Sequence, residues 1–310
     1  MKTFFIRLAS GLAFGAVAIS ALLFSPYTFF AVMSIVLIGT LNEYFNITQA
    51  KREVTKGFFQ SKWFVIGLCY FAFADSFILA SPPAAGVPDF NNMLLAAFQV
   101  LTRFRDSALT LNATLPMLVF FIFIAELFSK SEKPFENLGW KTVAVFWITV
   151  PMILTNKIYF DQGAPFILAM FMIFWVYDSF CYIFGSLIGK TKLFERISPK
   201  KTVEGMIGGL VVTMAVAYFA NLIPYLQNHS RVEWMILAFF ICIAATFGDL
   251  VESLLKRSLG IKDSGNIMPG HGGFLDRMDA YFFVVPVVAT LLWWFMQVKS
   301  LMLVYEYLSQ

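Results

Sequence analysis

Nine apolar runs, most of them close to the length that an α-helix needs to cross a bilayer, constrain this chain most strongly. The runs cover residues 8–24, 27–45, 63–79, 113–128, 140–154, 165–188, 206–224, 232–252 and 280–297. A transmembrane helix needs about 20 predominantly apolar residues. The runs lack the period-two alternation of barrel strands, and backbone groups in lipid must pair internally, so each run is predicted to be a helix. The expected fold class is therefore all-α, a polytopic integral membrane bundle of about nine transmembrane helices.

The composition supports a membrane protein and excludes several other classes. Of the 310 residues, 59% are hydrophobic and only 14% are charged, whereas soluble domains carry roughly 25% charged residues. A soluble enzyme, a nucleic-acid-binding domain and a disordered protein are excluded, so the lipid bilayer is an expected partner and nucleic acid is not. The three Cys and two His residues are too scattered for a disulfide framework or a zinc cluster.

The distribution of Lys and Arg predicts the orientation. With a cytoplasmic N-terminus, the segments 1–7, 46–62, 129–139, 189–205 and 253–277 lie on one side and hold 17 of the 23 basic residues, as the positive-inside rule requires. This count treats the short apolar run 93–101 as a half-helix or interfacial segment. The first run, 8–24, is interpreted as a retained span instead of a cleaved signal peptide.

Charge is concentrated in the C-terminal part of the chain. Nine of the 31 positions from Asp249 to Asp279 are charged, about twice the chain average. Asp249, Ser253 and Lys256 stand at i, i+4 and i+7, so they share one stripe at the end of a predicted helix. A loop rich in glycine and polar residues follows, and Asp276 lies three positions before Asp279 at the start of the next helix.

The carboxylates of Asp249, Asp276 and Asp279 are candidate metal ligands. Three carboxylates gathered at one point require a counter-charge, and Mg²⁺ accepts carboxylate oxygens while leaving positions for substrate phosphates. The alternative is a network of interfacial salt bridges with Lys256, Arg257 and other basic residues of the segment. The density of charge and the glycine-rich backbone favour a site.

A second cluster lies between residues 178 and 205. Asp178 falls well inside an apolar run, where a charge is costly and points to function. A basic loop follows, and it ends in Ser198-Pro199-Lys200-Lys201-Thr202 and Glu204-Gly205 as the next run begins. Because both clusters lie in the second half, the chain is divided into N-terminal spans 1–160 of unassigned role and a catalytic membrane domain 161–310.

These two clusters resemble the phosphatidate cytidylyltransferase family, the CDP-diacylglycerol synthases. The family pattern is carried by Ser253, Lys256-Arg257, Lys262-Asp263, Gly265, Pro269, His271-Gly272-Gly273 and Asp276-Arg277-Met278-Asp279. Asp178-Ser179 with Tyr182, and Ser198–Gly205, are similar to the family's nucleotide-binding region. The departures are Cys181, where Ala is usual, and Met268, where Leu, Ile or Phe is usual.

The resemblance implies the reaction CTP + phosphatidate → CDP-diacylglycerol + diphosphate, which belongs to phospholipid biosynthesis. It also implies Mg²⁺, alone or with a monovalent cation such as K⁺, and it is compatible with a homodimer. The expected location is a bacterial inner membrane, with the active site on the cytoplasmic face. The expected catalytic residues are Asp249, Ser253, Lys256, Arg257, Asp276, Arg277 and Asp279. The expected substrate-binding residues are Asp178, Ser198, Lys201, Thr202, Glu204, Lys262, Asp263, His271, Gly272 and Gly273.

Two other functions stay open at this point. A CTP-dependent polyprenol or phytol kinase resembles the family in its Lys-Thr-x-Glu-Gly loop, but it would transfer the γ-phosphate to an alcohol. A transporter also uses intramembrane carboxylates and broken helices. No internal repeat is visible and the acidic residues gather at helix ends, so the transporter is the less favoured alternative.

Overall fold

The computed structural model describes residues 15–49, 61–81, 107–129, 131–265, 267 and 272–308. Within these ranges seven helices are long and apolar enough to cross a membrane: Pro26–Gln49, Lys62–Ala80, Pro134–Gln162, Ala164–Leu187, Val203–Ala220, Arg231–Leu259 and Leu275–Met302. Shorter apolar helices, Gly15–Phe24 and Thr114–Leu127, lie at the other two predicted positions. The polytopic helical membrane fold is confirmed. The run 93–101 and the start of the first run lie outside the described residues.

The described chain forms two compact units, and the first of them is Phe24–Asp161. Its elements are α2 (Pro26–Gln49), α3 (Lys62–Ala80), α5 (Ser107–Leu127), α6 (Pro134–Val143), a π-helical stretch η1 (Ala144–Thr149) and most of α7 (Val150–Gln162). Helix α3 contacts α2 and α5, and α5 also contacts α6. Its core includes the fully buried rings of Tyr44 and Phe73.

A buried ion pair is the main polar feature of this unit. Lys141 Nζ lies 2.6 Å from Glu126 Oε2, and the two side chains are 8% and 2% exposed. Asn137 Nδ2 donates to the other oxygen of Glu126 at 3.1 Å. Both carboxylate oxygens are therefore satisfied, as a charge buried away from water requires.

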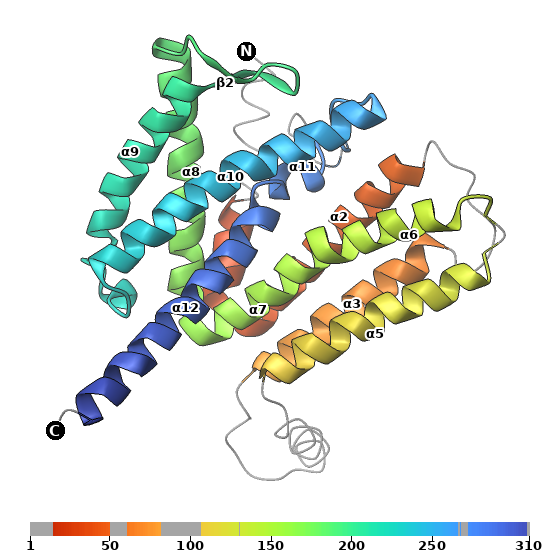
Figure 1. Cartoon of the computed structure of the whole chain (residues 1–310), viewed down its shortest axis with the longest axis horizontal. Coiled ribbons are helices and arrows are strands. Elements are labelled where there is room, and N and C mark those ends of the chain that lie inside the picture. Colours follow the sequence, from red (N-terminus) through yellow and green to blue (C-terminus); the bar gives the residue numbers. More distant parts are fainter. Residues whose placement is uncertain are drawn as a thin grey trace. The chain divides into compact units, whose positions relative to one another are not determined.

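The second unit contains 15–23 and the described residues from Gln162 onward. It holds α8 (Ala164–Leu187), β1 (Lys192–Phe194), β2 (Ser198–Thr202), α9 (Val203–Ala220), a short 3₁₀ turn η2 (Pro224–Leu226), α10 (Arg231–Leu259), α11 (Leu275–Met278) and α12 (Tyr281–Leu308). Figure 1 shows α9 running beside α8 and the start of α12 approaching α10, and α9 also contacts α10.

Two details differ from the sequence prediction. The basic loop before α9 is an antiparallel hairpin in which Lys192 pairs with Thr202, so the unit is not purely helical. Helix α10 continues to Leu259, well past the apolar run that ends at residue 252 and slightly past the predicted polar helix end that carries Ser253 and Lys256, and it stops where Gly260 takes a left-handed conformation with φ of 67°. Apolar content marks only the part of a helix that faces lipid, whereas the cap residue decides where the helix ends.

Small residues fix the position of α9 against α8. A Cβ on Gly205 would lie 2.7 Å from the carbonyl oxygen of Cys181 and 3.1 Å from the Cα of Gly185. The two backbones therefore touch, as small residues allow in membrane helices. This contact places the hairpin and the first turn of α9 directly beside the polar end of α8.

Candidate active site

The polar end of α10 carries the first group of predicted site residues. Asp249, Ser253, Lys256 and Arg257 all lie in this helix, and Ser253 Oγ donates to Asp249 Oδ1 at 3.3 Å. Lys256 and Arg257 occupy the last turn, where the helix dipole favours cations. The predicted helical stripe is therefore present, with its cations at the end of the helix.

An ion pair joins the two clusters that the sequence identified separately. Lys201 Nζ, from the end of β2, lies 2.5 Å from Asp249 Oδ2. The next residue, Thr202, caps α9 by accepting a hydrogen bond from Gly205 N at 3.2 Å. The cap therefore fixes the backbone next to Lys201. From this position the side chain of Lys201 reaches the carboxylate of Asp249 on α10.

Asp276 is held by donors on both of its oxygens. Lys256 Nζ lies 2.8 Å from Oδ1. The backbone N of Ser264, its Oγ and the backbone N of Gly273 each donate to Oδ2 at 2.9 Å. Gly272 has a positive φ of 79°, and a Cβ there would lie 2.5 Å from Asp276 Oδ2. Asp276 therefore holds the two ends of the loop Ser264–Gly273.

The start of α12 approaches α10 closely at Gly248. A Cβ on this glycine would lie 2.8 Å from the Asp279 carbonyl oxygen and 2.9 Å from the Ala280 Cα. Asp279 consequently comes within electrostatic range of Asp249, Asp178 and Lys201. Three carboxylates and one ammonium, from α8, β2, α10 and the turn between α11 and α12, thus share one region.

No group of three or more His, Cys, Asp or Glu side chains in the described part of the chain converges closely enough to hold a metal ion. Lys201 contacts Asp249 and Lys256 contacts Asp276, so an ammonium group lies against two of the three carboxylates. The metal-ligand roles of Asp249, Asp276 and Asp279 stay predictions.

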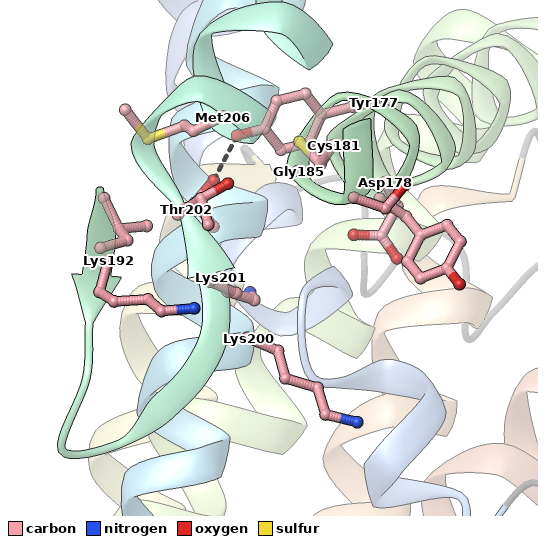
Figure 2. A pocket seen from close by; sticks show the side chains of 13 residues that line it. Tyr177, Asp178, Cys181, Gly185, Lys192, Lys200, Lys201, Thr202 and Met206 are labelled. Atoms are coloured by element: carbon pink, nitrogen blue, oxygen red, sulfur yellow. Dashed lines mark hydrogen bonds between the residues drawn. The ribbon is translucent and has the colours of Figure 1, made fainter. Parts of the chain in front are cut away.

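A cavity of about 490 Å³ opens between α8 and the hairpin. In Figure 2, Lys192, Lys200 and Lys201 extend from the hairpin, while Tyr177 and Asp178 come from α8. The Tyr177 hydroxyl lies 2.5 Å from Thr246 Oγ1, so it ties α8 to α10 at the cavity wall. The cavity thus combines an ammonium-rich side with an apolar and hydroxyl-bearing wall.

The cavity includes Asp178, Lys201 and Thr202 from the predicted substrate-binding set. It also includes Cys181, Tyr182 and Lys200, which lie in the segments that resemble the family's nucleotide-binding region but were not predicted to bind substrate. The lining residues that sequence reasoning missed are Tyr177, Gly185, Ser186, Lys192, Leu193, Met206 and Thr246. Lys192 lies in the basic segment 189–205, which the sequence analysis used only to predict orientation. The strand alternation that pairs it with Thr202 was the available signal, but three residues are too few to identify a strand by pattern.

Glu204 does not line this cavity, and it stabilises the neck of the hairpin instead. Its carboxylate accepts hydrogen bonds from the backbone N of Lys190 at 3.1 Å and of Thr191 at 3.0 Å. It therefore holds the end of α8 against the start of α9. Its predicted contact with substrate stays untested.

The remaining predicted residues lie outside the cavity lining. Ser198 begins β2, and the side chains of Arg257, Lys262, Asp263 and Arg277 are exposed. His271 lies outside the described residues, so its predicted role is not located. Three of these exposed side chains, those of Arg257, Lys262 and Arg277, are basic.

Comparison with known proteins agrees with this site. The model of the cytidylyltransferase family matches residues 82–295. A protein named phosphatidate cytidylyltransferase from Bacillus subtilis (strain 168) is 37% identical over 186 residues, which cover 59% of this chain and 67% of the relative.

Staphylococcal proteins of the same name cover less of the chain. The Staphylococcus aureus (strain COL) protein is 44% identical over 138 residues, which cover 43% of this chain and 50% of the relative. The Staphylococcus saprophyticus protein is 43% identical over 134 residues. The chain spans about half the length of these curated relatives. The family match over residues 82–295 covers both clusters of the site, and the chain belongs to the cytidylyltransferase family.

Proposed function

We propose that this protein is a phosphatidate cytidylyltransferase, which converts CTP and phosphatidate into CDP-diacylglycerol and diphosphate. The ion pair between Lys201 and Asp249 carries the proposal, because it brings the hairpin cations to the carboxylate-rich end of α10. The names of the relatives support the same activity. The site would lie in the domain formed by residues 161–310, with residues 1–160 as further membrane spans.

The chemistry needs charge neutralisation more than proton transfer. A phosphate oxygen of phosphatidate, already anionic, attacks the α-phosphorus of CTP. A new P–O bond forms, the bond from the α-phosphorus to the bridging oxygen breaks, and diphosphate leaves with the electron pair. No general base is required, and the barrier is dominated by repulsion between the anionic partners. Enzymes lower such barriers mainly by positioning and electrostatic stabilisation.

The basic side chains supply this stabilisation. Lys192, Lys200 and Lys201 line the cavity and are suited to the phosphates of CTP. Arg257 and Arg277 are exposed, so phosphate groups of substrate or product have access to them. The cavity itself would orient CTP, with Asp178 as a contact to the nucleotide or to a second cation.

Mg²⁺ is the proposed cofactor, alone or with a monovalent cation such as K⁺. Asp249 and Asp279 offer hard oxygen ligands that suit this ion, and the ammonium of Lys201 against Asp249 supports a cation-binding character at this point. The bound ion would offset the negative charge of the CTP phosphates. Asp276 remains a candidate ligand, although both of its oxygens have protein donors.

The proposal extends to the cellular setting. The excess of basic residues on one side of the predicted spans supports a cytoplasmic N-terminus and a site on the cytoplasmic face of a bacterial inner membrane. Labelling of an Arg196→Cys variant with a membrane-impermeant maleimide would test this, since inverted vesicles should react and spheroplasts should not. A homodimer would be visible as twice the protomer mass in detergent-corrected light scattering.

The activity is tested with two labelled forms of CTP. Purified protein, Mg²⁺ and phosphatidate should transfer the label of α-³²P-CTP into lipid and leave the label of γ-³²P-CTP in diphosphate. Label from γ-³²P-CTP in lipid would instead indicate a kinase, and no lipid label from either form would contradict the proposal.

A matched pair of variants links the activity to the site. Lys201→Met should lower activity strongly, because it removes the cation from Asp249. Lys299→Met is the control, because Lys299 also pairs with a carboxylate of α10, Glu233 at 2.9 Å, near the opposite end of the helix. Equal activity of the two variants would refute the assignment of Lys201.

A further inference from the structure

Glu252 is a buried carboxylate of α10 to which no role has been assigned so far. Its side chain is 0% exposed, and its Oε2 lies 2.6 Å from Lys256 Nζ, one helical turn further along. Its Oε1 has no hydrogen-bond partner among the described residues. Burying a carboxylate is costly unless it is paired, so the contact with Lys256 is its main compensation.

Lys256 connects Glu252 to the site. Its Nζ lies 2.6 Å from Glu252 and 2.8 Å from Asp276 Oδ1. The second oxygen of Asp276 accepts the three donors from Ser264 and Gly273. The contacts therefore run without interruption from a buried position on α10 to both ends of the loop before α11.

The buried ion pair of the first unit shows no such continuation among the described residues. Lys141 contacts Glu126 at 2.6 Å, and the second oxygen of Glu126 receives Asn137. The carboxylate of Glu126 thus has a donor on each oxygen, and both donors belong to the first unit. Lys256, in contrast, is shared between two carboxylates, so its location depends on both of them.

We propose that Glu252 is a positioning residue for the transfer reaction. It holds Lys256 at the distance at which Lys256 fixes Asp276, whose other oxygen accepts from Ser264 and Gly273. The inference rests on the proposed function. A lysine ammonium sits on a flexible stem, so without a second anion its location is not fixed. Glu252 supplies that anion from the buried side of the helix, so Asp276 and its donors at Ser264 and Gly273 keep their positions.

Two variants test the role of the charge and the distance. Glu252→Gln keeps the shape and removes the charge, so hydrogen exchange at the amides of Ser264 and Gly273 should accelerate. Its kcat should fall by about tenfold or more, as expected for a displacement of site groups by a fraction of an ångström to one ångström, with KM for CTP changed much less. Glu252→Asp keeps the charge but shortens the side chain by one methylene, so Lys256 no longer spans both contacts. Intermediate values of exchange and kcat are expected.

Glu233→Gln is the matched control, because Glu233 is also a carboxylate of α10 that pairs with a lysine, Lys299. This control should lose stability without a change in kcat or in loop exchange. In a Lys256→Met background, Glu252→Gln should add no further acceleration of loop exchange, because the connection is already broken.

Several results would overturn the inference. For Glu252→Gln, unchanged hydrogen exchange at Ser264 and Gly273 would do so, and so would a wild-type kcat per folded molecule. If Glu252→Gln does not fold, wild-type exchange and wild-type kcat in Glu252→Asp would overturn the inference. Lack of activity in the wild-type protein would refute the proposed function, and with it the reaction for which Glu252 positions the loop. The exchange measurements would then still decide whether the connection from Glu252 to the loop exists.

Discussion

Substituting Gly248 by Ala tests whether the close approach of α10 and α12 creates the site. The added Cβ would lie 2.8 Å from the Asp279 carbonyl oxygen, 2.9 Å from the Ala280 Cα and 3.2 Å from the Phe283 Cβ. Two of the three contacted atoms belong to backbone, which cannot rotate away. Ordinary contact begins at 3.4 Å, so the start of α12 must move outward by about 0.6 Å, the difference between 3.4 and 2.8 Å.

This displacement has separable effects on stability and activity. Overpacking of this kind costs about 1–3 kcal/mol, and the better helix propensity of Ala returns about 1 kcal/mol. The net loss of stability is therefore at most about 2 kcal/mol. Because a misplacement of about 1 Å can cost on the order of a hundredfold in rate, a shift of about 0.6 Å should lower kcat by roughly tenfold.

The assay is CDP-diacylglycerol formation per folded molecule, with thermal unfolding in detergent measured in parallel. Gly67→Ala is the control, because Gly67 lies in α3 and a Cβ there would meet nothing within 4 Å. The control should be as active as the wild type and at least as stable. If Gly248→Ala shows the same activity as Gly67→Ala, the close approach does not position Asp279 for the reaction.

Three further predictions concern other parts of the chain. Lys141→Met should destabilise the protein by about 3–5 kcal/mol in chemical unfolding, because Glu126 would be left buried without its cation; a simultaneous Glu126→Gln change should recover most of this loss. Burial lowers the pKa of His229 below its ordinary value of about 6.5, so the folded state binds fewer protons than the unfolded state, and the free energy of unfolding should fall as pH drops through 6.5. This loss should be absent in His229→Gln, and an equal pH slope in both proteins would contradict the assignment. Glu204→Ala removes the acceptor of the Thr191 amide, so KM for CTP should rise more than kcat falls, whereas an unchanged KM would argue against a role of the hairpin in binding CTP.

Hydropathy predicted the spans because lipid selects apolar side chains over the length of a bilayer. Seven of the nine runs correspond to helices of spanning length in the described chain. The ends of the helices were harder to predict from the sequence. Helix α10, for example, ends at the Gly260 cap and begins with a capping box between Ser230 and Glu233. Such ends depend on single polar residues, which an average over an apolar window does not detect.

Local spacing also predicted part of the site. Asp249, Ser253 and Lys256 lie on one helix as expected, because residues four apart on a helix are neighbours whatever surrounds them. The pairing of Lys201 with Asp249 was not predictable from spacing, because it joins residues 48 positions apart through the packing of α9, which follows the hairpin, against α10.

The sequence by itself determined that this chain is a polytopic helical membrane protein and that its scarce charge is concentrated near two segments. Those properties depend on composition and on neighbours along the chain. Only the tertiary structure decided which charged and polar groups pair. Asp276 accepts hydrogen bonds from Ser264 and Gly273, and Lys256 contacts both Asp276 and Glu252. Electrostatic contacts act over a few ångströms in space, so they are fixed by helix packing and not by distance along the chain.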